Sequence, residues 1–156
     1  MTEGLRILLI HGGHAGGRTE ALRAAVVEGV TSAGEPAELR VLRALDASID
    51  DLLWGQGLLI GTPEHFGYMS GAVKDFFDRT FYPAEGRTGG LPWALFVSAG
   101  NDGSGTANAV ERIATGYRWK RIADPVIVVG PPDDAALDRC RELGATMAAG
   151  LAAGVF

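Results

Sequence analysis

The chain has 156 residues, of which 47% are hydrophobic and 21% charged, and its formal net charge at pH 7 is −5. This length and composition predict a single globular domain, residues 1–156, and exclude a disordered chain. The acidic balance argues against nucleic acid as a partner, and no apolar run is long enough to cross a membrane. Cys140 is the only cysteine, so no internal disulfide can form, and without a signal-peptide pattern we expect a cytoplasmic protein.

Apolar runs that are typical of strands recur along the chain, beginning at residues 7–10. Similar unbroken runs follow at residues 58–60, 94–97 and 126–129. Such runs favour strands that are buried on both faces, as in a parallel sheet. The more mixed run at residues 39–43 favours a strand at the edge of that sheet.

Helical periodicity fills the intervals between these strands. Four segments place apolar residues on one helical face, and residues 48–54 predict a shorter helix. The four faces are Leu22, Ala25, Val26, Gly29 and Val30; Val73, Phe76, Phe77 and Phe81; Val110, Ile113, Ala114 and Tyr117; and Leu137, Cys140, Gly144, Met147, Ala148 and Leu151. This alternation predicts a three-layer, doubly wound α/β fold with a five-stranded parallel sheet, for which we favour the order 2-1-3-4-5. The longest loop is expected at residues 83–92.

Three segments rich in glycine or small polar residues follow the first, third and fourth central strands. They are the first loop (residues 11–18), the second loop (residues 61–70) and the third loop (residues 98–105). Folds of this class bind ligands at the carboxyl ends of the strands, near the switch point between strands 1 and 3. The three loops should therefore meet and form a binding site.

The first loop resembles a phosphate-binding turn. Its glycines open a helix, and backbone N–H groups together with the helix dipole can bind a phosphate without a cationic side chain. Thr19 can either cap this helix or donate its hydroxyl to a phosphate oxygen. His11, at the end of the strand, is expected to be packed and hydrogen-bonded. The candidate phosphate-binding residues are Gly13, His14, Ala15, Gly16, Gly17, Arg18 and Thr19.

Other phosphate sites fit the first loop poorly. A P-loop nucleotide triphosphatase needs a lysine where this chain has Arg18, and an Asp at the end of another strand to hold Mg²⁺. The Gly-x-Gly-x-x-Gly dinucleotide fingerprint fails because His14, Ala15 or Arg18 stands where glycine is required. A phospho-receiver would need an acidic residue at the end of strand 1 or 3. A flexible strand-to-helix connection is the remaining alternative.

The second loop and the following helix carry a family resemblance. Residues 61–79 read Gly-Thr-Pro-Glu-His-Phe-Gly-Tyr-Met-Ser-Gly-Ala-Val-Lys-Asp-Phe-Phe-Asp-Arg. This stretch resembles the flavodoxin-like, FMN-dependent NAD(P)H oxidoreductases, including NADPH-dependent FMN reductases and WrbA-like quinone reductases. Their motif is Thr-Pro-x-x-Phe/Tyr-Gly-x-Met/Leu-Ser/Ala-Gly before a helix ending in Lys/Arg-x-Phe-x-Asp-Arg/Gln. The resemblance covers nearly the whole chain and implies a flavodoxin-like fold, FMN as cofactor and NAD(P)H as reductant.

The resemblance implies that the second loop lies along the flavin ring and that its backbone contacts flavin N5. Phe66 and Tyr68 can then cover the flat ring, and Gly67 lets the main chain approach it. His65 is the candidate catalytic residue, as a proton relay, although a solvated loop histidine is an equal alternative. The candidate cofactor-binding residues of this loop are Pro63, Glu64, His65, Phe66, Gly67, Tyr68 and Met69.

In the family, the third loop borders the pyrimidine edge of the flavin. Its backbone amides and Asn101 can match that edge, whereas Asp102 and Ser104 can instead shape the turn or cap a helix that begins at Thr106. The candidate residues are Ser98, Ala99, Gly100, Asn101 and Asp102. The first loop departs from the family because it lacks the usual Ser or Thr near its start. Backbone donors would therefore carry the binding of phosphate.

These features predict an FMN-binding oxidoreductase that transfers hydride from NAD(P)H through the flavin to a quinone, a free flavin or another small acceptor. The alternatives are a flavodoxin-type electron carrier and a flavodoxin-shaped chain that no longer binds flavin. A homo-oligomer is also compatible with the sequence. No metal-ligand spacing is present, so we expect no metal site, and Cys140 on an apolar helical stripe is expected to be inert.

Overall fold

The structure is a computed structural model that describes residues 4–156. In this part of the chain, seven strands and five helices follow one another in the order β1–α1–β2–α2–β3–β4–α3–β5–α4–β6–β7–α5. The strands are β1 (Leu5–His11), β2 (Ala37–Arg43), β3 (Gly57–His65), β4 (Tyr68–Met69), β5 (Pro92–Ala99), β6 (Lys120–Arg121) and β7 (Val126–Val129). The helices are α1 (Arg18–Ser32), α2 (Ile49–Trp54), α3 (Gly71–Ala84), α4 (Ser104–Gly116) and α5 (Asp134–Ala153).

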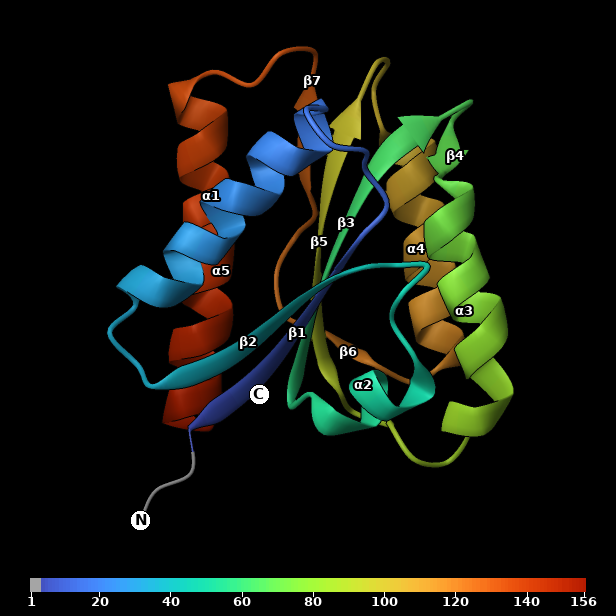
Figure 1. Ribbon diagram of the computed structural model, residues 1–156, viewed down its shortest axis with the longest axis vertical. Helices are drawn as coiled ribbons and strands as arrows, with labels where there is room; N and C mark the ends of the chain where they lie inside the picture. Colours follow the sequence, from blue (N-terminus) through green and yellow to red (C-terminus); the bar gives the residue numbers. More distant parts are fainter. Residues whose placement is uncertain (1–3) are drawn as a thin grey trace.

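A twisted parallel sheet forms the middle layer of the molecule (Figure 1). Its strands run in the order β2-β1-β3-β5, and both β6 and β7 pair with the far side of β5. Because β6 and β7 act as one interrupted edge strand, this is the predicted order 2-1-3-4-5. The flavodoxin-like, doubly wound fold class is thus confirmed, and β2 lies at the edge as its mixed sequence predicted.

Helices cover both faces of the sheet, with α1 and α5 on one side and α2, α3 and α4 on the other (Figure 1). Successive residues of β1 enter opposite cores: Ile7 and Leu9 pack under α1 and α5, while Leu8 and Ile10 pack under α3 and α4. This alternation is the period of a strand, and it explains why the central strands read as unbroken apolar runs.

Helices α1 and α5 pack at very short range because glycine lies at their closest contacts. A Cβ atom on Gly144 would collide with the carbonyl oxygen of Val26, and one on Gly29 would collide with that of Arg141. Cys140 is fully buried on α5, and burial raises the pKa of its thiol to about 11. This confirms the prediction that Cys140 is a core residue. No helix within residues 4–156 has the length and apolar character needed to span a membrane.

Two predicted element boundaries are wrong. The long loop covers residues 85–91 rather than 83–92, because α3 continues through Pro83. Pro83 removes one N–H donor, but it lies only one residue before the helix ends. Helix α4 begins at Ser104 rather than at Thr106. Its N-cap is Gly103, whose φ of 73° lies in the left-handed region that glycine adopts without strain.

The second loop is largely a hairpin instead of an open loop. β3 continues to His65 and turns at Phe66 and Gly67 into β4, with Glu64 paired to Met69 and His65 paired to Tyr68. The sequence did not predict this strand extension because the motif carries Pro63 and two titratable residues instead of an apolar run. The consequence is that the predicted site residues of this segment are placed by a hydrogen-bonded ladder.

Candidate functional site

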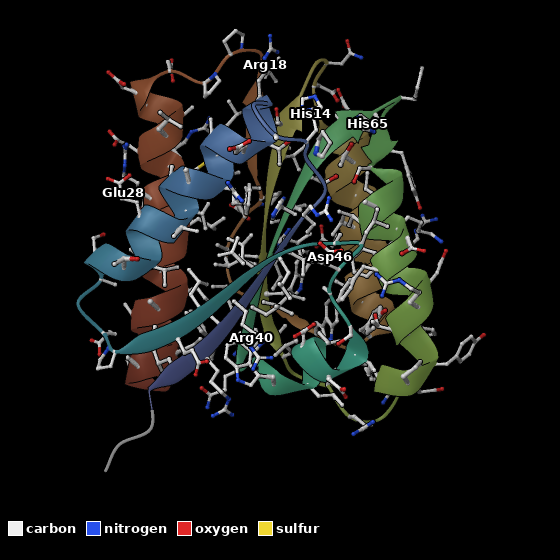
Figure 2. The ribbon with its side chains drawn as sticks, viewed as in Figure 1. His14, Arg18, Glu28, Arg40, Asp46 and His65 are labelled. Carbon is white, nitrogen blue, oxygen red and sulfur yellow. The ribbon has the colours of Figure 1, made fainter. Side chains whose placement is uncertain are left out.

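A hollow of about 430 Å³ lies at the carboxyl ends of β1, β3 and β5. Figure 2 shows His14, Arg18 and His65 together at this rim of the sheet. All three predicted loops contribute, and the volume is within the range of small-molecule sites. The lining residues are Gly12, Gly13, His14, Gly16, Gly17, Arg18, Thr19, Pro63, His65, Ser98, Ala99 and Gly100.

A larger hollow, of about 500 Å³, lies away from the three loops, where α3 and α4 end. Its walls include Phe81, Tyr117 and Arg118. Ligands of doubly wound folds bind at the carboxyl ends of the strands, and this hollow is not at those ends. We therefore assign the candidate site to the smaller hollow, at which the three loops meet.

The first loop offers unpaired donors at the start of α1. The N-cap residue is Gly17, and no side chain caps the first turn, so Thr19 does not have the capping role. Thr19 is 3% exposed, lines the hollow, and its hydroxyl makes no hydrogen bond within residues 4–156. Two backbone donors are already engaged, because the Gly16 N–H donates to the Glu20 carboxylate and the Gly17 N–H donates to the His14 carbonyl oxygen at 3.1 Å. The helix dipole and the remaining N–H groups favour an anion at this position.

Close packing requires glycine at two positions of the first loop. A Cβ atom on Gly12 would collide with Oγ of Ser70, and one on Gly13 would lie 2.6 Å from Cβ of Thr19. The Gly12 N–H also donates to the Gly61 carbonyl oxygen at 2.9 Å, which ties the loop to β3. Steric fit and main-chain bonding thus set the shape of this loop.

His11 lies at the base of the first loop and is half-buried. Its Nε2 lies 3.5 Å from Nη1 of Arg23, and burial, followed by the charge of Arg23, lowers the pKa of the imidazole. The prediction of a packed, hydrogen-bonded histidine is confirmed. His11 does not line the candidate site; it lines a neighbouring hollow on the other side of the first loop.

The predicted residues of the second loop lie in different surroundings. Pro63 and His65 line the hollow, whereas Met69 is 2% exposed and packs in the core. Phe66 is fully exposed with a φ of 53°, and Tyr68 lines a separate hollow along α4. The ring-covering role of these two aromatic side chains stays a prediction, since neither side chain lies in the candidate site of this structure.

Glu64 connects the end of β3 to the third loop. Its Oε1 accepts a hydrogen bond from the Asn101 N–H at 2.7 Å, and its Oε2 accepts one from the Gly103 N–H at 2.9 Å. Asp102 accepts from the N–H and the hydroxyl of Ser104, and these bonds lower the pKa of the Asp102 carboxyl. Backbone amides of the third loop that were candidates for a ligand are therefore engaged by carboxylates of the chain.

The predicted residues thus separate into two groups. Ala15, Glu64, Phe66, Gly67, Tyr68, Met69, Asn101 and Asp102 do not line the hollow, while the other predicted residues do. Sequence reasoning missed Gly12, which lines the hollow directly after β1. The glycine run was the available signal for Gly12, and its contact with Ser70, far along the chain, was not readable from the sequence. No three His, Cys, Asp or Glu side chains within the described range could hold a metal ion.

Comparison with known proteins decides the family. The model of NADPH-dependent FMN reductases matches residues 5–126. This chain belongs to the NADPH-dependent FMN reductase family. The family is one of flavodoxin-like, FMN-binding flavoproteins, and at this level the chain is an oxidoreductase.

The relatives of this family member include a flavodoxin and an NAD(P)H dehydrogenase (quinone). The chain is 30% identical over 148 residues to a flavodoxin of Aquifex aeolicus (strain VF5), covering 85% of this chain and 80% of that protein. It is 34% identical over 90 residues to an NAD(P)H dehydrogenase (quinone) of Acidithiobacillus ferrooxidans, covering 57% of this chain but only 43% of that protein. The solved structure of a flavodoxin from the domain Archaea matches with a TM-score of 0.82 at 19% identity, covering 95% of this chain and 99% of that one.

Proposed function

We propose that this chain binds FMN in the candidate site and oxidises NAD(P)H, with a quinone, a free flavin or another small molecule as the electron acceptor. The observation that carries the proposal is the uncapped start of α1 beside the free Thr19 hydroxyl, at the point where three loops of an FMN-binding family meet. A phosphate monoester needs several hydrogen-bond donors, and this part of the hollow offers them.

Different residues of the hollow would bind different parts of FMN. The first loop would hold the phosphate with backbone N–H groups, the Thr19 hydroxyl and the exposed Arg18 guanidinium. Pro63 and Gly100 would leave room for a flat ring between the second and third loops. Bound FMN would supply the redox chemistry, in which a hydride equivalent passes from NAD(P)H to the acceptor. Reduction of a quinone by hydride also consumes one proton, which His65 at the rim could deliver.

An electron carrier is the second candidate function. The match to the Aquifex flavodoxin over 80% of its length favours it. A carrier would bind FMN in the same hollow but would dock to a protein, and it would react slowly with a nicotinamide nucleotide. We also propose a cytoplasmic location and a homo-oligomer, to be tested by fractionation and by light scattering.

Two measurements on the purified chain test the proposal. In the first, FMN is titrated into apo-protein and quenching of flavin fluorescence is followed; we expect saturable one-to-one binding. In the second, the reconstituted protein is mixed with NADH or NADPH in a stopped-flow instrument, and we expect fast bleaching of the oxidised flavin. Bleaching no faster than that of free FMN would favour the carrier, and the absence of binding would reject both functions.

A further inference from the structure

The parallel ladder between β3 and β5 ends at the first residue of the third loop. Its last pair joins Pro63 to Ser98, and β5 itself ends at Ala99. Main-chain pairing between these strands therefore cannot set the position of residues 100–103, which follow at the wall of the candidate site. Some other contact must hold this part of the third loop beside β3.

The Glu64 carboxylate supplies that contact. Both of its oxygen atoms accept backbone N–H groups of the third loop, those of Asn101 and Gly103, at 2.7 and 2.9 Å. Hydrogen bonds to an ionised acceptor are about twice as strong as neutral ones. Glu64 is half-buried and makes no ion pair within residues 4–156, so these two amides are the hydrogen-bond partners of its carboxylate.

The bond to Gly103 also acts on the start of α4. Gly103 is the N-cap of this helix, has a left-handed backbone, and makes no side-chain cap of its own, since it has no side chain. A Cβ atom there would lie 2.6 Å from Cγ2 of Ile127, so both the conformation and the available space require glycine. A carboxylate from β3 at this helix start is favoured by the dipole of α4.

We infer that Glu64 is a positioning residue for the cofactor: it does not bind the ligand but fixes the third loop so that Gly100 forms a wall of the site. This role rests on the proposed function, because FMN is the ligand that would use that wall. It differs from the role expected from the sequence, in which Glu64 contacts the cofactor directly. The lining of the hollow supports the revised role, since it contains Pro63, His65 and Gly100 but not Glu64.

The test compares wild type, Glu64→Gln and a control, Glu111→Gln. The control makes the same chemical change in a carboxylate on α4 that pairs with Arg121 at the surface, away from the hollow. In E64Q a single amide oxygen replaces two carboxylate oxygens, and an NH₂ group faces a backbone donor. We expect the Asn101 and Gly103 amides of ligand-free E64Q to exchange with solvent about tenfold faster, as measured by NMR, and FMN to bind about tenfold more weakly. E111Q should change neither quantity.

A spectroscopic comparison gives a readout other than cofactor binding. The amide proton shifts of Asn101 and Gly103 should differ between ligand-free wild type and E64Q but not between wild type and E111Q, because these protons bond directly to the Glu64 carboxylate. Unchanged shifts in E64Q would overturn the inference, as would E64Q binding FMN as tightly as wild type does. Failure of wild type itself to bind FMN would instead reject the proposed function, and with it the cofactor role of Glu64, even if the amide shifts changed as expected.

Discussion

The first and third loops border the same hollow but are held in different ways. In the first loop, Gly12 and Gly13 fit against neighbouring atoms with no room for a side chain. In the third loop, Gly100 has open space around it, although Gly103 does not, and the Glu64 carboxylate of β3 accepts hydrogen bonds from two amides. The wall at Gly12 and Gly13 is therefore shaped by close packing, and the wall at Gly100 depends on hydrogen bonds to a carboxylate.

This difference matches what each wall is expected to bind. A phosphate is recognised by donors in a fixed cradle, and the first loop keeps its helix start uncapped for that purpose. The edge of a planar ring needs a wall at the correct distance, and the third loop obtains it from the hydrogen bonds of Glu64. Substitution of Gly12 should accordingly act through lost space, and substitution of Glu64 through lost hydrogen bonds.

The largest effect is expected from adding one methyl group to a glycine of the first loop. Gly12→Ala forces a Cβ atom onto Oγ of Ser70, which caps α3 by accepting from the Val73 N–H. Overpacking of this kind costs about 1–3 kcal/mol in the free energy of unfolding, and FMN affinity should fall with it. Urea denaturation and FMN titration measure the two quantities.

Gly100→Ala is the matched substitution in the third loop. A Cβ atom there has no neighbour within 4 Å, so the free energy of unfolding should stay within about 0.5 kcal/mol of wild type. Equal destabilisation by G12A and G100A would show that the two loops are not held differently.

A smaller effect is expected from removing the hydroxyl of Thr19. Thr19→Val keeps the shape that packs against Gly13 but removes the free donor. Because a hydrogen bond to a charged group contributes about 1.5–3 kcal/mol, FMN affinity should fall about tenfold or more. Thr19→Ser, which keeps the hydroxyl, should bind FMN nearly as well as wild type. If riboflavin, which lacks the phosphate, lost as much affinity as FMN in T19V, the hydroxyl would not be a phosphate donor.

The sequence predicted the architecture better than the contacts within the site. Unbroken apolar strands and apolar helical faces are local signals, and they specified the sheet, its layers and the three converging loops. The bonds of Glu64 join residues 37 and 39 positions apart, and the contact of Gly12 with Ser70 spans even more of the chain. Such pairings depend on where β3 ends, and the apolar pattern did not predict that end because Pro63 interrupts it.

Removing the charge of Arg18 should have a still smaller effect, because backbone donors define the first loop. Arg18 is exposed and is the first residue of α1, so it is well placed for a phosphate but badly placed for the helix dipole. Arg18→Ala should therefore weaken FMN binding about threefold at low salt, with no loss at high salt, and should slightly stabilise the fold. Isothermal titration at two ionic strengths measures this. A salt-independent loss of more than about tenfold would make the side chain, rather than the backbone, the main phosphate ligand.

The smallest effect is expected from the pH response of the first loop. Burial and Arg23 lower the pKa of His11 in the folded chain below its unfolded value, so the unfolded state binds more protons in mild acid. His11 therefore contributes full stability above its unfolded pKa of about 6.5 and loses it as pH falls through the folded pKa. His11→Gln removes the titrating group while keeping a polar side chain. The difference in unfolding free energy between wild type and H11Q should be constant from pH 7 to 8. Toward pH 5 the wild-type protein should lose stability relative to H11Q, with a slope below about 1.4 kcal/mol per pH unit. Urea denaturation across this range measures it, and a shift in favour of wild type in acid would mean that the base of the first loop holds a charged imidazole, as the third loop holds a charged carboxylate.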